Sequence, residues 1–95
     1  MLQGWQASAH TPAVSLSERV RKAGAALGCD VWARSSGRHV LLGLTGDDAF
    51  ARVTPLGAGS FGLAFREGAE TWEPMLLVDA LGDVVEHALV GVGAL

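Results

Sequence analysis

The stretch Thr71–Val92, TWEPMLLVDALGDVVEHALVGV, has the longest helical period in the chain. On a helical wheel its apolar residues share one side, namely Leu77, Leu81, Val84, Val85, Ala88 and Leu89. Three acids share the opposite side at i, i+4 and i+7 spacing, namely Asp79, Asp83 and Glu86. Thr71 can cap such a helix, and Pro74 is tolerated in a first turn, whose N–H groups have no helical partner. The pattern predicts a helix over 71–92 that buries Leu81 against the core.

A second helix is predicted over Leu16–Leu27. Ser15 and Glu18 have the spacing of a capping box, in which the first residue is the N-cap and the second lies at N3. Gly28 is placed to end the helix in the left-handed conformation. Gly24 costs helix stability in the interior, so it indicates close packing on the sheet.

Four strands are predicted between these helices, as two hairpins: 30–35 with 38–44, and 49–54 with 60–66. Two-residue and five-residue loops join them, at 36–37 and 55–59. In the first hairpin we expect Ser35 opposite Arg38 and Trp32 opposite Leu41. In the second we expect Thr54 opposite Ser60. Both registers give one apolar face and one mixed face, which is typical of a half-covered antiparallel sheet.

The predicted fold is therefore α+β, in the order αββββα, with a four-stranded antiparallel sheet. We expect residues 1–95 to form a single domain, of which residues 1–12 are an N-terminal arm. The alanine-rich stripe of the first helix needs little apolar surface, so we expect both helices on the same sheet face. The open face would then carry an apolar centre and a basic rim: Trp32, Leu41, Phe50 and Ala64, ringed by Arg34, His39, Arg52 and Arg66.

Composition limits the function. A hydrophobic content of 49% with 18% charged residues is that of a globular domain. The first 14 residues lack the basic and apolar regions of a secretory signal, no apolar run is long enough to span a membrane, and Cys29 is the single cysteine. These features favour a cytoplasmic protein. The net charge of −3 is divided unevenly: residues 1–66 carry seven bases and four acids (+3), and residues 67–95 carry six acids and no base (−6).

Residues 56–62, LGAGSFG, resemble the glycine-rich loop of protein kinases. A kinase also needs a lysine on the following strand and an aspartate-bearing catalytic loop, whereas the one lysine here, Lys22, lies upstream. We therefore interpret this stretch as a hairpin loop that uses glycines at positive φ. His10, His39, His87 and Cys29 lack metal-ligand spacing, and no cofactor motif is present.

The hypothesis that we favour is a non-catalytic protein-binding module, such as an adaptor, an accessory subunit, or a secretion-chaperone-like or immunity-like protein. Its predicted contact residues are Trp32, Arg34, His39, Leu41, Phe50, Arg52 and Arg66 on the open face and Asp79, Asp83 and Glu86 on the C-terminal helix. An apolar centre with an arginine rim is typical of an interface. We expect a second copy to cover the open face in a twofold dimer, with the arm, led by Leu2 and Trp5, as the competing cover.

Two alternatives stay open. The sheet face could bind nucleic acid through Arg34, Arg38, Arg52, Arg66, Trp32 and Phe50. The net negative charge and a pI of about 5.4 argue against that alternative. The chain could also be a small enzyme with its site at an oligomer seam, where His39 or His87 would act as acid or base.

Overall fold

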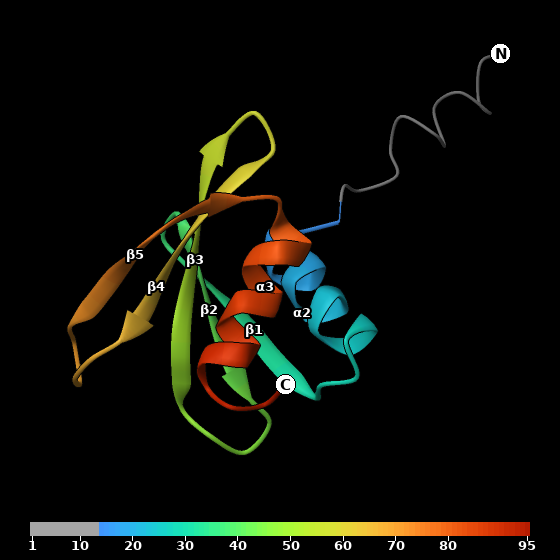
Figure 1. Cartoon of the computed structure of the whole chain (residues 1–95), viewed down its shortest axis with the longest axis vertical. Coiled ribbons are helices and arrows are strands. Elements are labelled where there is room, and N and C mark those ends of the chain that lie inside the picture. Colours follow the sequence, from blue (N-terminus) through green and yellow to red (C-terminus); the bar gives the residue numbers. More distant parts are fainter. Residues whose placement is uncertain (1–13) are drawn as a thin grey trace, which may run out of the picture.

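The computed structural model describes residues 14–95, so the predicted arm over 1–12 lies outside the described residues. Along the chain, an N-terminal helix is followed by the strands of an antiparallel sheet and then by a C-terminal helix, which confirms the α+β class (Figure 1). The helices are α2 (Leu16–Ala26) and α3 (Leu81–Gly91). The strands are β1 (Val31–Ser36), β2 (His39–Leu44), β3 (Ala49–Gly57), β4 (Ser60–Arg66) and β5 (Trp72–Asp79). They follow one another across the sheet in chain order, and their number is five rather than the predicted four.

The fifth strand arises because the single helix predicted over 71–92 is wrong. Trp72–Asp79 pairs with β4, and the helix occupies only Leu81–Gly91. Thr71 does not cap a helix; its carbonyl accepts the backbone N–H of Glu67 across the β4–β5 turn at 2.9 Å. The backbone groups along the outer edge of β4 need partners, and residues 72–79 supply them. Pro74 is compatible with this role because an edge strand tolerates proline.

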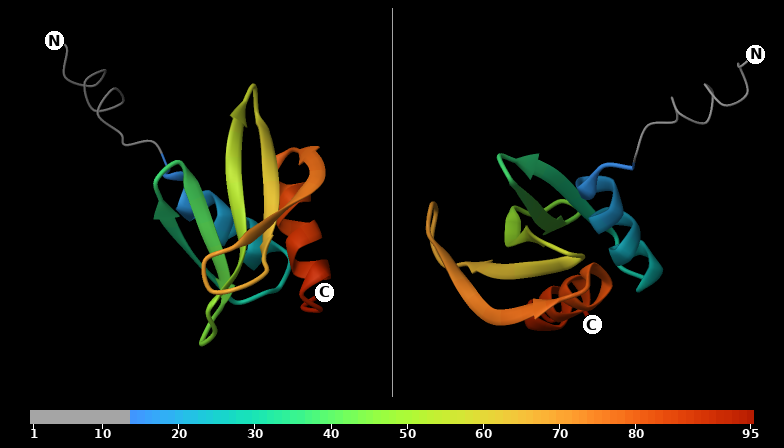
Figure 2. Two further views of the ribbon diagram at one scale, coloured as in Figure 1. Left: turned by 90° about the vertical axis from the view of Figure 1, so that its left-hand side faces the viewer. Right: turned by 90° about the horizontal axis from the view of Figure 1, so that it is seen from above.

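Both helices lie on the same face of the sheet (Figure 2). Helix α2 covers β1 and β2, helix α3 covers β4 and β5, and the two helices contact each other. The core between these layers is buried and entirely apolar: Val20, Val31, Val40, Leu42, Ala51, Val53, Phe61, Leu63, Leu81, Val84, Val85, Ala88 and Leu89. Leu81 is buried, as predicted, although it opens its helix instead of lying in the middle of one.

The predictions for the first helix are confirmed in part: it begins at Leu16 as predicted but ends at Ala26, one residue before Leu27, and the Glu18 carboxylate accepts from Arg21 instead of completing the capping box. The Ser15 hydroxyl accepts the backbone N–H of Glu18 at 3.2 Å, and Gly28 follows the helix with φ +83°. Gly24 is buried against β1, and a Cβ built on it would lie 2.5 Å from Cγ2 of Val31. The missing side chain therefore allows helix and sheet to approach closely.

Both hairpin registers differ from the prediction by two residues. Ser35 lies opposite Val40, and Thr54 lies opposite Gly62, instead of Arg38 and Ser60. The turns move accordingly: Gly37 and Arg38 connect β1 to β2, and Ala58 and Gly59, both with positive φ, connect β3 to β4. A shift of two preserves the alternation of faces, so the predicted inner face is still the inner face. The LGAGSFG stretch is thus strand, turn and strand.

Candidate functional site

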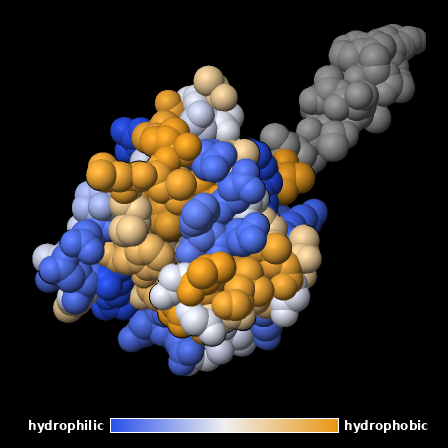
Figure 3. Space-filling view, in the orientation of Figure 1, coloured by the Kyte–Doolittle hydropathy of each residue, from blue (hydrophilic) through white to orange (hydrophobic). Residues whose placement is uncertain are grey.

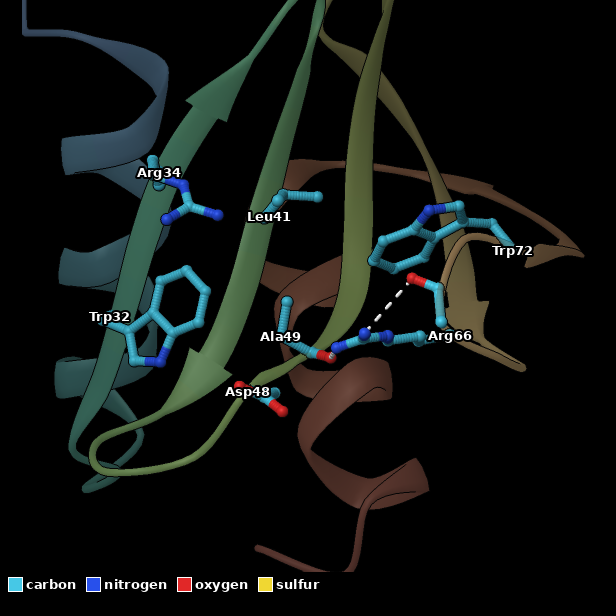
Figure 4. Close-up of a pocket in the computed structure, with 8 residues that line it drawn as sticks. Trp32, Arg34, Leu41, Asp48, Ala49, Arg66 and Trp72 are labelled. Carbon is cyan, nitrogen blue, oxygen red and sulfur yellow. Dashed lines mark hydrogen bonds between the residues drawn. The ribbon is translucent and has the colours of Figure 1, made fainter.

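The open face of the sheet holds a groove of about 370 Å³. Its lining residues come from all five strands and from two loops: Trp32, Arg34, Leu41, Asp48, Ala49, Arg66, Ala69 and Trp72. Trp32 and Trp72 point inward from opposite sides, and Leu41 lies between them on the floor (Figure 4). Leu41 lies opposite Arg34 of β1 and Arg52 of β3. Trp32, which was predicted opposite Leu41, lies opposite Gly43 instead.

Trp32 forms a rigid wall of the groove. Its indole N–H donates to the carbonyl oxygen of Asp47 at 2.9 Å. Its ring lies over Gly43, where a Cβ would come within 2.5 Å of the indole. The guanidinium carbon of Arg34 lies 5.5 Å from the ring centre, within the range of a cation–π contact. Each contact restrains the indole, so this wall is preorganised.

Trp72 forms the opposite wall; it was absent from the predicted contact residues because residues 71–92 were expected to form a helix. The guanidinium of Arg52 stacks on its ring, 5.2 Å from the ring centre. Nε of Arg52 is buried and has no hydrogen-bond partner in the part of the chain that the structure describes. Pro74, two residues after Trp72, was interpreted as a first-turn residue of a helix, but it is equally a signal for an edge strand and could have indicated one here.

Two other residues of the predicted contact set have internal partners. Arg66 donates to the carbonyl oxygens of Ala49, Gly68 and Ala69 at 3.0–3.3 Å, so its guanidinium holds the β4–β5 turn. Nδ1 of His39 lies 2.7 Å from Oγ1 of Thr54. Partial burial, followed by the nearby charges of Arg52 and Arg38, lowers the pKa of His39 below its usual value.

Phe50 lies away from the groove, contrary to the expected grouping. Leu42 pairs with Ala51 and Gly43 pairs with Ala49, which leaves Phe50 as the extra residue of a bulge in β3. The bulge breaks the alternation of faces, and Phe50 packs against the buried core. Its large side chain therefore contributes to stability and not to the groove.

A second surface forms where β5 passes over α3. Gly62 of β4 pairs with Val78, whereas Ala64 pairs with Pro74, so Met75, Leu76 and Leu77 together lie opposite Leu63. This irregularity displaces the strand outward, and Leu76 is completely exposed, at 108% of its reference area. Met75, Val78 and Val90 are also exposed. Apolar side chains accordingly gather over β5 at the surface (Figure 3).

An apolar pocket of about 470 Å³ lies between β5 and α3. Its lining is mostly hydrocarbon: Leu63, Phe65, Met75, Leu76, Leu77, His87, Val90 and Gly91. Next to it, Asp79, Asp83 and Glu86 line a hollow together with His87 and Val90. The structure thus brings the three predicted acids together, although Asp79 belongs to a strand, because that strand ends directly before α3.

Within residues 14–95, no group of three or more His, Cys, Asp or Glu residues is arranged to hold a metal ion. None of the helices in that same range has the length and apolar character needed to cross a membrane. No protein-family model, no curated protein and no solved structure matches this chain.

Proposed function

We propose that this chain is a non-catalytic protein-binding module, and that its contact surface is formed by β5 and α3. The observation that carries the proposal is Leu76, which is fully exposed beside an apolar pocket. Exposing leucine, methionine and two valines in one patch is costly in water, and contiguous apolar patches on monomers mark interaction sites. The surrounding acids make this surface resemble an interface core with a polar rim.

The irregular pairing of β5 determines how a partner binds. A bulged edge strand is a poor template for adding another strand, because its N–H and C=O groups no longer form a regular row. The pocket between β5 and α3 offers a different mode, in which apolar side chains of the partner insert beside Leu76. Such anchors in pockets provide most of the free energy of many interfaces.

Charge selects the partner. Residues 67–95 carry six acids and no lysine or arginine, and Asp79, Asp83 and Glu86 lie at the edge of the pocket. A twofold dimer through this surface would bring these acids of two copies together, which like-charge repulsion disfavours. The partner is therefore a different protein segment, with an apolar anchor flanked by lysine or arginine.

Like-charge repulsion also argues against the homodimer that was expected through the open face. Arg34 and Arg52 lie on that face, on either side of Leu41, and a twofold contact would oppose arginines to arginines. A head-to-tail contact between the basic face and the acidic surface would pair opposite charges, but it generates open-ended assemblies. A concentration series in sedimentation velocity separates these cases, since only a head-to-tail contact produces assemblies that keep growing.

The proposal is tested by selecting ligands from a random peptide library against the folded chain. We expect enriched peptides with an apolar residue flanked by basic residues, which lose binding at least tenfold to the Leu76→Asp variant. Leu56→Asp is the matched control, because Leu56 is an exposed leucine in β3, away from the pocket. Peptides without basic enrichment, or equal loss in both variants, would overturn the proposal.

Charge reversal gives a second, independent measurement. Asp83→Lys with Glu86→Lys should slow association of the selected peptides and remove most of its dependence on salt, since charges at the edge of an interface act mainly on the association rate. Glu70→Lys, in the β4–β5 turn, provides the control for net charge. An association rate that is unchanged by the double reversal would show that the acids do not take part.

A further inference from the structure

We propose that the groove on the open face binds a mononucleotide, with its base against the indoles of Trp32 and Trp72 and its phosphate on Arg34. This inference concerns a different surface from the protein-binding site, and neither depends on the other. It rests on the shape of the groove, on the charges around it and on the single carboxylate that lines it.

The walls of the groove are suited to a flat aromatic ring. Indoles line it on two sides, and both are braced from within the protein, Trp32 by Gly43 and Asp47 and Trp72 by Arg52. Aromatic side chains of this kind stack nucleobases in many sheet-based sites, whatever the base. Rigid walls also reduce the entropy lost when a small ligand binds.

Several arginines lie on this face, and none of them forms an ion pair with a carboxylate of the described residues. Across residues 14–95, Arg21 and Glu18 form the one ion pair, and that pair lies on α2. Arg66 is engaged by three carbonyl oxygens, and Arg38 donates to the carbonyl of Pro55. Arg34 lines the groove and has no hydrogen-bond acceptor among the described residues, so its planar donors are available to a phosphate.

Asp48 determines the orientation in which a nucleotide would lie in the groove. Its carboxylate lines the groove away from Arg34 and has no hydrogen-bond partner within residues 14–95 (Figure 4). A carboxylate repels phosphate but accepts a hydrogen bond from the exocyclic amino group of a base such as cytosine. The phosphate is therefore expected at the Arg34 end and an amino group of the base at the Asp48 end.

The size of the groove and the net charge favour a single nucleotide over a strand. The volume of about 370 Å³ lies near the lower end of the range for small-molecule sites. A longer polyanion would also meet the field of the six acids in residues 67–95 and a net charge of −3. A mononucleotide contacts only the basic face.

The test is a calorimetric titration of the full chain with cytidine and uridine monophosphates at low salt. We expect saturable binding of one nucleotide, with the cytidine form binding several-fold more tightly. Arg34→Gln should weaken both by about tenfold, and Asp48→Asn should remove the preference for cytidine. Lys22→Gln, on the helical side of the molecule, is the control for charge, and it should bind like the parent.

Each other outcome overturns the inference. Absence of saturable binding at millimolar nucleotide excludes the site. Equal effects of Arg34→Gln and Lys22→Gln would indicate attraction by net charge alone. A cytidine oligonucleotide that binds more than tenfold more tightly than the monophosphate would assign the groove to single strands instead. Arg34 and Asp48 are exposed, so these variants keep the fold, which circular dichroism checks.

Discussion

Replacing Gly24 with alanine tests how closely α2 packs on the sheet. The added Cβ would lie 2.5 Å and 3.3 Å from the two methyl carbons of Val31, which is buried. Alanine favours a helix interior over glycine by about 0.5–1 kcal/mol. Overpacking a core costs about 1–3 kcal/mol. We therefore expect a net loss of about 0–2.5 kcal/mol in the free energy of unfolding, measured by urea denaturation.

Gly82 provides the matched control, because a Cβ built there meets nothing within 4 Å. Gly82→Ala should be neutral or stabilising by up to about 1 kcal/mol. Val31→Ala alone should cost about 2 kcal/mol through lost burial and a cavity. In the double variant the alanine at position 24 enters the vacated space, so the combined loss should be smaller than the sum. Stabilisation by Gly24→Ala, or strict additivity with Val31→Ala, would refute the close approach.

Two further predictions concern α3 and β2. Leu89→Ala should cost about 2–5 kcal/mol of stability because Leu89 is fully buried. Val90→Ala, at a position that is 55% exposed, should cost less than about 0.5 kcal/mol. Similar losses in the two variants would show that the core-facing side of α3 has been assigned wrongly. The pKa of His39 is lower in the folded chain than in the unfolded chain, so the unfolded chain binds this proton more tightly. The contribution of His39 to the free energy of unfolding is therefore fully present above about pH 6.5 and is lost as the pH falls toward the native pKa. His39→Gln should flatten the decrease in urea midpoint over that interval, and an unchanged profile would show that another group is responsible.

The inner face of the sheet was predictable in spite of wrong registers. Alternation along each strand decides which side chains share a face, and both registers were displaced by two residues, which preserves that alternation. Val31, Val40, Val53 and Leu63 therefore lie in the core as their spacing indicated. Turn positions were less predictable because serine, glycine and arginine around 36–38 permit neighbouring two-residue loops.

The fate of residues 72–79 could not be read from local sequence. Met75–Val78 is a short apolar run, which suits a helix or a strand equally, and periodicity alone does not separate them. The conformation of residues 72–79 is decided by a part of the chain that lies outside this run. Strand β4 needs a partner along its outer edge, and that edge exists only once the sheet has formed. The same non-local cause explains why Trp72 was missing from the predicted open face and why the exposure of Leu76 was not foreseen.

Strand β5 connects the two proposed sites while keeping them separate. Its first residue, Trp72, lines the groove, its irregular middle presents Leu76 on the other side, and its last residue, Asp79, joins the acidic cluster. The change of register between Pro74 and Val78 divides the strand into two segments that pair independently with β4. A substitution at Leu76 therefore leaves the pairing behind Trp72 intact, and a substitution at Arg34 leaves the pocket on α3 intact. Loss of peptide binding in Leu76→Asp with retained nucleotide binding, and the converse in Arg34→Gln, is the pattern that two separate surfaces require.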